Sequence, residues 1–292
     1  NKTYDLSKYR KIFLIAVGKD AFAASSEIKE ILKDKLTDGV VLSLKSKKIK
    51  GLQTFQCTHP QPSLNNVEAT KKVIDLVKSS REDDLILIVI SGGGSAMLTA
   101  PYKITYEDKA LVADTLMNSG ANIEELNIVR KHLSEIKGGR LAALAYPSQV
   151  VTMIFSDVIG NDLSTIASGP TVVDHTTVDD ANRVLKKFEV LRKLSLESLE
   201  LFESPKEHKY FQRVDNLLLI DNSVATSAME ETARGLGYSI RVYANNLKGL
   251  AHEVGAKLLK EGRQGEALIA AGETTVEVVG AGIGGRNQEM VL

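Results

Sequence analysis

The stretch DDLILIVISGGGSAML (83–98) contains the pattern that decides the fold. Its segment 85–90 is apolar on both faces, as expected for a central strand of a parallel sheet. Glycines after such a strand let the backbone approach a ligand closely, and amides at a helix start favour an anion. We therefore expect a phosphate- or substrate-binding loop, with a tight structural turn as the alternative, at Ser91, Gly92, Gly93, Gly94 and Ser95. The loop lacks the lysine of a Walker A motif, so its positive charge must come from elsewhere.

Other apolar segments also end in residues that can carry chemistry. The segment 12–17 is followed by Gly18-Lys19, 54–59 ends at His59, and 150–155 is followed by Ser156-Asp157. Helical patterns lie between the strands, which predicts an α/β fold with a Rossmann-like, doubly wound, mainly parallel sheet. Ligands bind at the carboxyl ends of the strands in such sheets, so these strand ends are expected to meet at one site.

The 292 residues are enough for two domains. We expect a Rossmann-like N-terminal domain over 1–180 and a second α/β domain over 181–292. Strands are expected in the second domain at 216–223, 238–245 and 266–279. The chain begins without methionine and ends in a helical pattern. We therefore expect that both ends of the natural protein lie outside it.

Composition excludes several classes of protein. Lys+Arg and Asp+Glu both number 37, which argues against a nucleic-acid or membrane-surface binder. The apolar runs are far shorter than the ~20 residues of a membrane span. A single cysteine, Cys57, rules out an internal disulfide and fits a reducing cytoplasm. The five histidines show no metal-ligand spacing, so no zinc site is expected.

The segment SDVIGNDLSTIASGP (156–170) is polar and begins where a strand ends. Its carboxylates could hold Mg²⁺ or accept a proton from a hydroxyl, and Asp157 is the best placed for either role. The alternative is that Asp162 or Ser164 caps a helix. The segment's further candidates for binding phosphate or substrate are Asn161, Asp162, Ser168 and Gly169.

The segment VRKHLSEIKGGRLA (129–142) reads as an amphipathic helix within a longer helical pattern at 127–145. Arg130, Ser134 and Lys137 are spaced i, i+4, i+7 and would share one side of that helix. Arg130 and Lys137 could grip an acid or phosphate, and a solvated basic face is the alternative. Two glycines, 138 and 139, are costly in a helix and suggest a close backbone approach or a helix break.

The segment GETTVEVVGAGIGGRNQE (272–289) contains a literal G-x-G-x-x-G at Gly280, Gly282 and Gly285. We discount it as a dinucleotide fingerprint, because the expected strand before it alternates polar and apolar residues and no acidic residue follows at the required distance. Arg286 is better interpreted as a mobile cation that faces phosphate. Glu273 and Asn287 are further candidates for binding phosphate or substrate.

Six stretches together resemble one family, the type II glycerate kinases (glycerate 2-kinases) with a MOFRL C-terminal domain. They occur in the family's order and cover nearly the whole chain. They are VGKDA (17–21), THPQP (58–62), SGGGSAMLTAP (91–101), VRKHLSEIKGGRLA (129–142), SDVIGNDLSTIASGPTV (156–172) and AGETTVEVVGAGIGGRNQEM (271–290).

The resemblance implies ATP-dependent phosphorylation of D-glycerate at the 2-hydroxyl, with Mg²⁺ or a similar divalent cation and an active site in an interdomain cleft. It places the family's functional lysine at Lys19, its aspartate at Asp157 and its arginine at Arg286. Asp157 is also the candidate for contact with the metal. A homodimer remains an option. Ser63 departs from the family pattern, which usually has an acidic residue there, and the remainder of the MOFRL domain would follow Leu292.

Phosphoryl transfer needs positioning and charge neutralisation more than covalent help. We expect the 91–95 backbone to hold ATP phosphates or the anionic end of the acid, and Lys19 and Arg286 to neutralise the transferring group. Asp157 would orient or deprotonate the hydroxyl, or hold the metal through water. Two alternatives remain: an NAD(P)-dependent hydroxypyruvate reductase, suggested by G-x-G-x-x-G, and a non-catalytic sensor of sugar acids or nucleotides.

Overall fold

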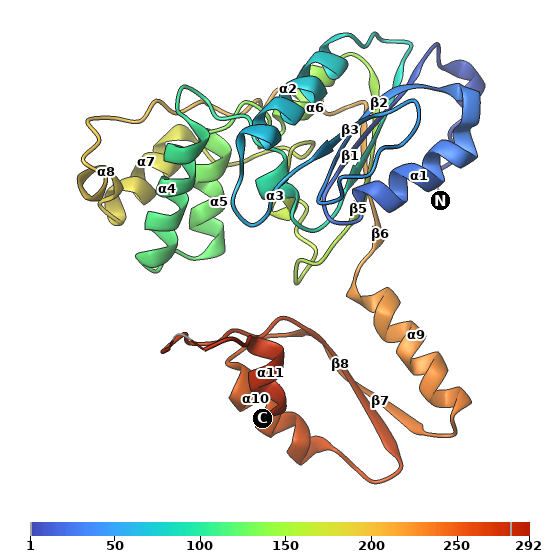
Figure 1. The fold of residues 1–292 in the computed structure, drawn as a ribbon, viewed down its shortest axis with the longest axis vertical. Helices are drawn as coiled ribbons and strands as arrows, with labels where there is room; N and C mark the ends of the chain where they lie inside the picture. The colour runs from blue at the N-terminus through green and yellow to red at the C-terminus, as the bar shows by residue number, and fades with distance from the viewer. Residues whose placement is uncertain (1, 281) are drawn as a thin grey trace. The chain divides into compact units, whose positions relative to one another are not determined.

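A computed structural model describes residues 2–280 and 282–292. The chain forms two compact units (Figure 1). The first runs to Phe155 and resumes over Asp162–Leu219, and the second contains Ser156–Asn161 and Ile220–Leu292. The expected boundary at 180/181 falls inside the first compact unit, because helices on both sides of it share one apolar core. The division into domains 1–180 and 181–292 stays a prediction.

A six-stranded sheet in the order β3-β2-β1-β4-β5-β6 is the centre of the first unit. Neighbouring strands from β3 to β5 pair in parallel. This is the strand order of dinucleotide-binding folds, in which the order reverses between β1 and β4. The predicted Rossmann-like, doubly wound sheet is therefore confirmed. The strands are β1 (Ile12–Val17), β2 (Leu36–Ser43), β3 (Gln53–Gln56), β4 (Leu85–Ile90), β5 (Gln149–Phe155) and β6 (Val214–Ile220).

Helices cover both faces of this sheet, so its central strands are apolar along their whole length. All six residues of β1 are buried, as are five of the six in β4. The helix α1 (Ala21–Leu32) packs on β1 and β2, whereas α2 (Leu64–Lys78) packs on β2, β3 and α6 (Arg140–Ala145). Right-handed crossovers in opposite directions place α1 and α2 on opposite faces, as Figure 1 shows.

A layer of four helices forms a separate apolar cluster in the first unit. Val112, Leu126 and Val184 are among its buried residues. The helices are α4 (Tyr106–Asn118), α5 (Ile123–His132), α7 (Val178–Lys187) and α8 (Val190–Lys193). The first unit also contains single 3₁₀ turns, which are η1 (Leu6–Lys8), η2 (Lys33–Lys35), η3 (Ile166–Ser168) and η4 (His208–Tyr210).

The predicted continuous helix over 127–145 is wrong. The helix α5 ends at His132, and the following residues bond to another segment: the Glu135 amide donates to the Ala100 carbonyl at 2.9 Å. Gly138 and Gly139 then take positive φ angles of 57° and 78°, which a right-handed helix cannot contain. The suspected helix break at the two glycines is confirmed. The Ser134 hydroxyl lies in the turn after α5 and donates to the Ala100 carbonyl at 3.3 Å.

The second unit is a smaller α/β arrangement built on a two-stranded parallel sheet. The predicted strand over 266–279 is too long, because β8 ends at Gly272 and the segment 276–279 forms no strand. The elements of this unit are α9 (Asn222–Gly235), β7 (Ser239–Leu247), α10 (Ala251–Glu261), β8 (Glu266–Gly272) and α11 (Arg286–Val291). Within the described parts of the chain, no helix combines the length and apolarity that crossing a membrane requires.

Candidate active site

The residues after β1 and β4 meet where the strand order of the sheet reverses. The Lys19 amide donates to the Gly92 carbonyl at 2.9 Å, and the Asp20 amide donates to the Ser91 hydroxyl at 3.0 Å. Gly18 has a φ of 122°, and a Cβ at this position would lie 2.3 Å from the Ser91 Oγ. Only glycine allows this approach, so the backbone itself fixes Lys19 beside the glycine loop.

The loop 91–95 is a tight turn that leaves three of its amides unused. The Gly94 amide donates to the Ser91 carbonyl at 3.2 Å, which closes the turn. Among the described residues, the amides of Gly92, Gly93 and Ser95 donate to no other group. The helix that follows, α3 (Gly94–Met97), has only four residues. The expected contribution of a helix start is therefore weak, and the three free loop amides are the available donors.

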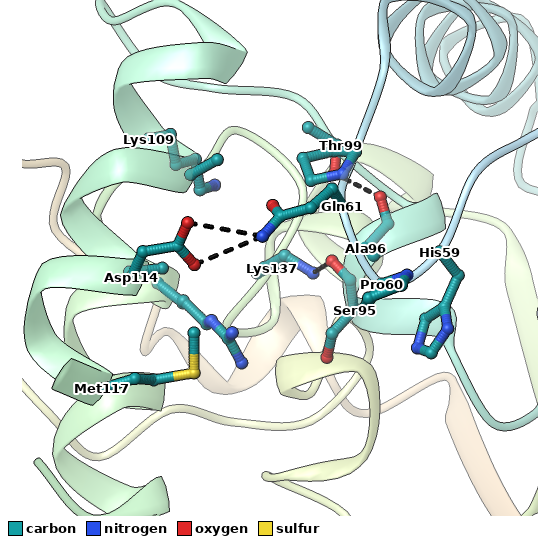
Figure 2. Close-up of a pocket in the computed structure, with 14 residues that line it drawn as sticks. His59, Pro60, Gln61, Ser95, Ala96, Thr99, Lys109, Asp114, Met117 and Lys137 are labelled. Atoms are coloured by element: carbon teal, nitrogen blue, oxygen red, sulfur yellow. Dashed lines mark hydrogen bonds between the residues drawn. The ribbon is translucent and has the colours of Figure 1, made fainter. Parts of the chain in front are cut away.

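A pocket of about 240 Å³ begins at the end of this loop. We call it the cationic pocket, because Lys109 of α4, Arg130 of α5 and Lys137 from the turn after α5 all line it. Figure 2 shows Lys109 and Lys137 in the pocket. Gln61 lies between Asp114 on one side and the segment 95–99 on the other. The remaining lining residues are His59, Pro60, Pro62, Ser95, Ala96, Thr99, Ala110, Ala113 and Met117.

Lys137 is fully buried and connects two loops. Its Nζ donates to the Ser95 carbonyl at 2.9 Å and to the Ala167 carbonyl at 3.3 Å. Burial, with the nearby charge of Arg130, lowers the pKa of the Lys137 ammonium from 10.5 to about 7. The side chain therefore holds the glycine loop and the 161–170 segment together through an ammonium that loses its proton easily.

Two other cations of the pocket are poorly compensated. The Lys109 side chain is 8% exposed, and its Nζ has no hydrogen-bond partner among the described residues. Burial, followed by the charges of Lys137, Arg130 and Arg140, lowers the Lys109 pKa well below its usual value. Burial also lowers the pKa of Arg130, although the carboxylate of Asp114 opposes this shift. The pocket therefore brings together three basic side chains whose charged forms are disfavoured by burial.

Residues of the segment 161–170 form hydrogen bonds within the segment and to the residues around Lys137. Asp162 accepts from the amide and hydroxyl of Ser164, so its carboxylate caps the local turn. The Ser168 hydroxyl donates to Asn127 at 2.9 Å, and the carbonyls of Ser168 and Gly169 accept from the amides of Gly138 and Gly139. These groups build the wall behind Lys137. Their own contact with a ligand stays a prediction.

The other predicted residues belong to the second unit. Asp157 is exposed, and the Asn161 amide donates to the Asp221 carboxylate at 2.6 Å. Arg286, the first residue of α11, forms an ion pair with Glu273. Asn287 is the next residue of α11 and lines a surface hollow with Gly280, Gly282 and Gly285. No strand directly precedes Gly280 and α11 is short, so the strand–turn–helix context of a dinucleotide fingerprint is not formed by the described residues.

Three residues of the cationic pocket escaped the prediction from sequence. Lys109 lies among polar residues at the start of α4, where a lysine is ordinarily exposed. Asp114 follows on the same helix, and Gln61 was noted only within the family stretch THPQP (58–62). The one available signal was a helical spacing: Lys109 and Ala113 are four residues apart, so one side of α4 carries a lysine beside small apolar residues.

Comparison with known proteins identifies relatives along the whole chain. The family model described as Domain of unknown function (DUF4147) matches residues 1–203. A D-glycerate 2-kinase from Thermotoga maritima is 35% identical over 97% of this chain and 70% of its own length. A crystal structure of a glycerate kinase from T. maritima matches with a TM-score of 0.84 and 34% identity, over 96% of this chain and 70% of that one. A provisional hydroxypyruvate reductase from Agrobacterium vitis is 33% identical over 96% of this chain and 76% of its own length.

Proposed function

The chain belongs to the glycerate 2-kinase family, and we propose that it transfers the γ-phosphoryl group of ATP to the 2-hydroxyl of D-glycerate, giving 2-phosphoglycerate. The observation that carries this proposal is the hydrogen bond from the Lys19 amide to the Gly92 carbonyl. It fixes a lysine beside a glycine loop at the reversal of the strand order, which is where such sheets bind ligands.

The glycine loop and Lys19 are proposed to hold and neutralise phosphate. The free amides of Gly92 and Gly93 can each donate to a phosphate oxygen. Lys19 is exposed, so its ammonium can reach the γ-phosphoryl group as a mobile point charge. A Walker A loop contains its own lysine, whereas here the cation follows a different strand. Charge neutralisation of this kind supplies much of the catalysis in phosphoryl transfer.

Two residues of the second unit are proposed to act at the reacting atoms. Asp157 would accept the proton of the 2-hydroxyl as the oxygen attacks phosphorus. Arg286 would stabilise the charge on the transferring group, and its exposed ion pair with Glu273 is weak enough to be exchanged for phosphate.

A divalent cation, when bound with ATP, neutralises phosphate charge and orients the γ-phosphoryl group. Within the described residues, no three His, Cys, Asp or Glu side chains gather as a metal site. Mg²⁺ is commonly held by one or two carboxylates together with substrate phosphates and water. The exposed carboxylate of Asp157 fits that kind of ligand set, and it would contact the ion directly or through water.

The activity is tested by ³¹P NMR of the product formed from ATP and D-glycerate. A phosphoryl group on the 2-oxygen supports the proposal, whereas a 3-phosphate or absence of product contradicts it. Lys19→Ala and Arg286→Ala should each lower kcat by about 100-fold or more while the circular dichroism spectrum stays unchanged. Lys71→Ala, at an exposed position of α2, is the control. Near-normal turnover in either test variant would refute the role of that residue.

The reductase alternative can be tested in parallel. It requires binding of NADH, which is detected by the fluorescence of the nicotinamide ring. The loop around Gly280 lacks a preceding strand, so we expect no saturable change in fluorescence. Turnover of hydroxypyruvate with NADH would favour the reductase, and D-glycerate binding without any turnover would favour the sensor.

A further inference from the structure

Lys109 is a buried ammonium that the protein itself does not compensate. It projects from α4, is more than nine-tenths buried, and its Nζ has no hydrogen-bond partner among the described residues. Placing a charge in such surroundings without a partner is costly, and a buried group left in this way requires an explanation. A methionine or leucine would fill the same space at lower cost, which points to a role in binding.

The groups that face Lys109 make its surroundings more positive still. Arg130 comes from α5, whereas Lys137, Arg140 and Glu135 come from the segment after α5. Asp114 lies on α4 itself and acts mainly on Arg130. His59 lines the pocket from the turn after β3. Cations therefore outnumber carboxylates around the Lys109 Nζ, and an anion would be attracted there.

The size of the pocket restricts which anion can enter. Its volume of about 240 Å³ lies below the roughly 300–1,000 Å³ of ordinary pockets for drug-sized ligands. Apolar walls at Pro60, Ala113 and Met117 limit it further. A three-carbon acid fits this space, whereas a nucleotide triphosphate does not. The adjoining Ser95 is the last residue of the glycine loop, so an acid in the pocket would lie next to the proposed phosphate site.

We propose that the cationic pocket binds the carboxylate of a short hydroxy acid and that Lys109 selects an acid over a neutral polyol. The inference rests on the proposed function, because the acid is the acceptor of the phosphoryl group. In this proposal the cationic pocket binds the acid, and the amides of Gly92 and Gly93 bind the phosphates of ATP.

Binding at this pocket should be coupled to proton uptake. The pKa of Lys137 is lowered to about 7 and that of Lys109 is lowered well below its usual value, so burial disfavours the charged form of both side chains. A carboxylate close to them favours the protonated form and raises both pKa values. Glycerate binding should therefore take up protons near neutral pH and weaken as the pH rises.

Lys109→Met tests the proposal, with Lys109→Arg as the conservative variant and Lys71→Met on the exposed face of α2 as the matched control. D-Glycerate binding is measured by isothermal titration calorimetry without ATP, in two buffers of different ionisation enthalpy. We expect a 10- to 100-fold weaker Kd for Lys109→Met, less proton uptake, and a raised KM for glycerate with kcat within about threefold. Lys109→Arg should recover part of the affinity, and Lys71→Met should match the parent protein.

The melting temperature separates this role from a structural one. Removing an uncompensated ammonium should raise the melting temperature of Lys109→Met, whereas loss of a structural lysine would lower it. Unchanged glycerate affinity in Lys109→Met overturns the proposal, and so does a parent protein that binds glycerol as well as glycerate. Glycerate binding that depends on Lys109, in a protein that forms no phosphoglycerate, would support the pocket and refute the kinase activity.

Discussion

Replacing Lys137 with methionine should change how the stability of the protein depends on pH. The Lys137 pKa is about 7 in the folded protein and 10.5 as the ordinary value for the unfolded chain. Between these values the unfolded chain binds more protons, so the free energy of unfolding rises with pH. The full difference corresponds to about 5 kcal/mol, and the part gained between pH 7 and pH 9 is about 2 kcal/mol. Below pH 7 the cost of the buried charge is present in full.

The variant should lose this rise, because methionine has a similar length and no charge. Lys109 titrates in the same direction, and removing its charged neighbour Lys137 should weaken its own pH dependence as well. Both effects therefore flatten the profile of Lys137→Met. The variant also leaves the carbonyls of Ser95 and Ala167 without a donor, which should lower its stability at high pH by about 1–3 kcal/mol.

Differential scanning calorimetry at pH 7, 8 and 9 measures the effect. The melting temperature of the parent protein should rise over this range by about 4 °C more than that of Lys137→Met. Lys71→Met, on the exposed surface of α2, should follow the parent protein. Parallel profiles for the parent and Lys137→Met would refute the idea that Lys137 is a buried, easily deprotonated ammonium.

Two further variants test the framework around the site. Gly139 has a φ of 78°, and the Cβ of Gly139→Ala would lie 2.7 Å from a ring carbon of Phe211, so this variant should lower the free energy of unfolding by roughly 2–4 kcal/mol. Gly120 has a similar φ of 84° but open space around it, so Gly120→Ala should lower the free energy of unfolding by only about 1 kcal/mol. Asp174→Asn removes the buried partner of Lys131 and should cost about 3–5 kcal/mol in urea denaturation at pH 7, whereas Glu200→Gln at an exposed ion pair should cost under about 1 kcal/mol. Equal costs within either pair would contradict the packing or the ion-pair argument.

The sheet could be predicted from sequence because its signals are local. The segments 12–17 and 85–90 are apolar throughout, and burial on both faces of a parallel sheet produces that pattern. The start of α4 also has a local cause, since the Thr105 side chain accepts from the Asp108 amide and caps the helix. Where the residues themselves contain the reason for a structure, the sequence is sufficient.

Long-range contacts decide the parts that could not be predicted. The helical pattern continues past His132, but the Glu135 amide bonds to Ala100 on a distant segment and draws the chain away from the helix. Arg130 and Lys137 do line one pocket, although the helical face that was expected to align them does not exist. Lys109 is buried where α4 packs beside α5 and the segment that follows α5. The residues next to Lys109 in the sequence do not indicate that its side chain is buried.

The positions of the cations explain why the glycine loop can lack a lysine. A lysine within the loop would have one fixed role, whereas the proposed site divides two roles between an exposed lysine and two buried ones. Lys19 is exposed and flexible, which suits a group that follows a phosphoryl group during transfer. Lys109 and Lys137 are buried, and burial lowers the pKa of both ammoniums, so an anion that enters the pocket would favour their charged forms. The same loop can therefore border a phosphate site and an acid site without a cation of its own, provided that the acid restores the charge of the buried lysines.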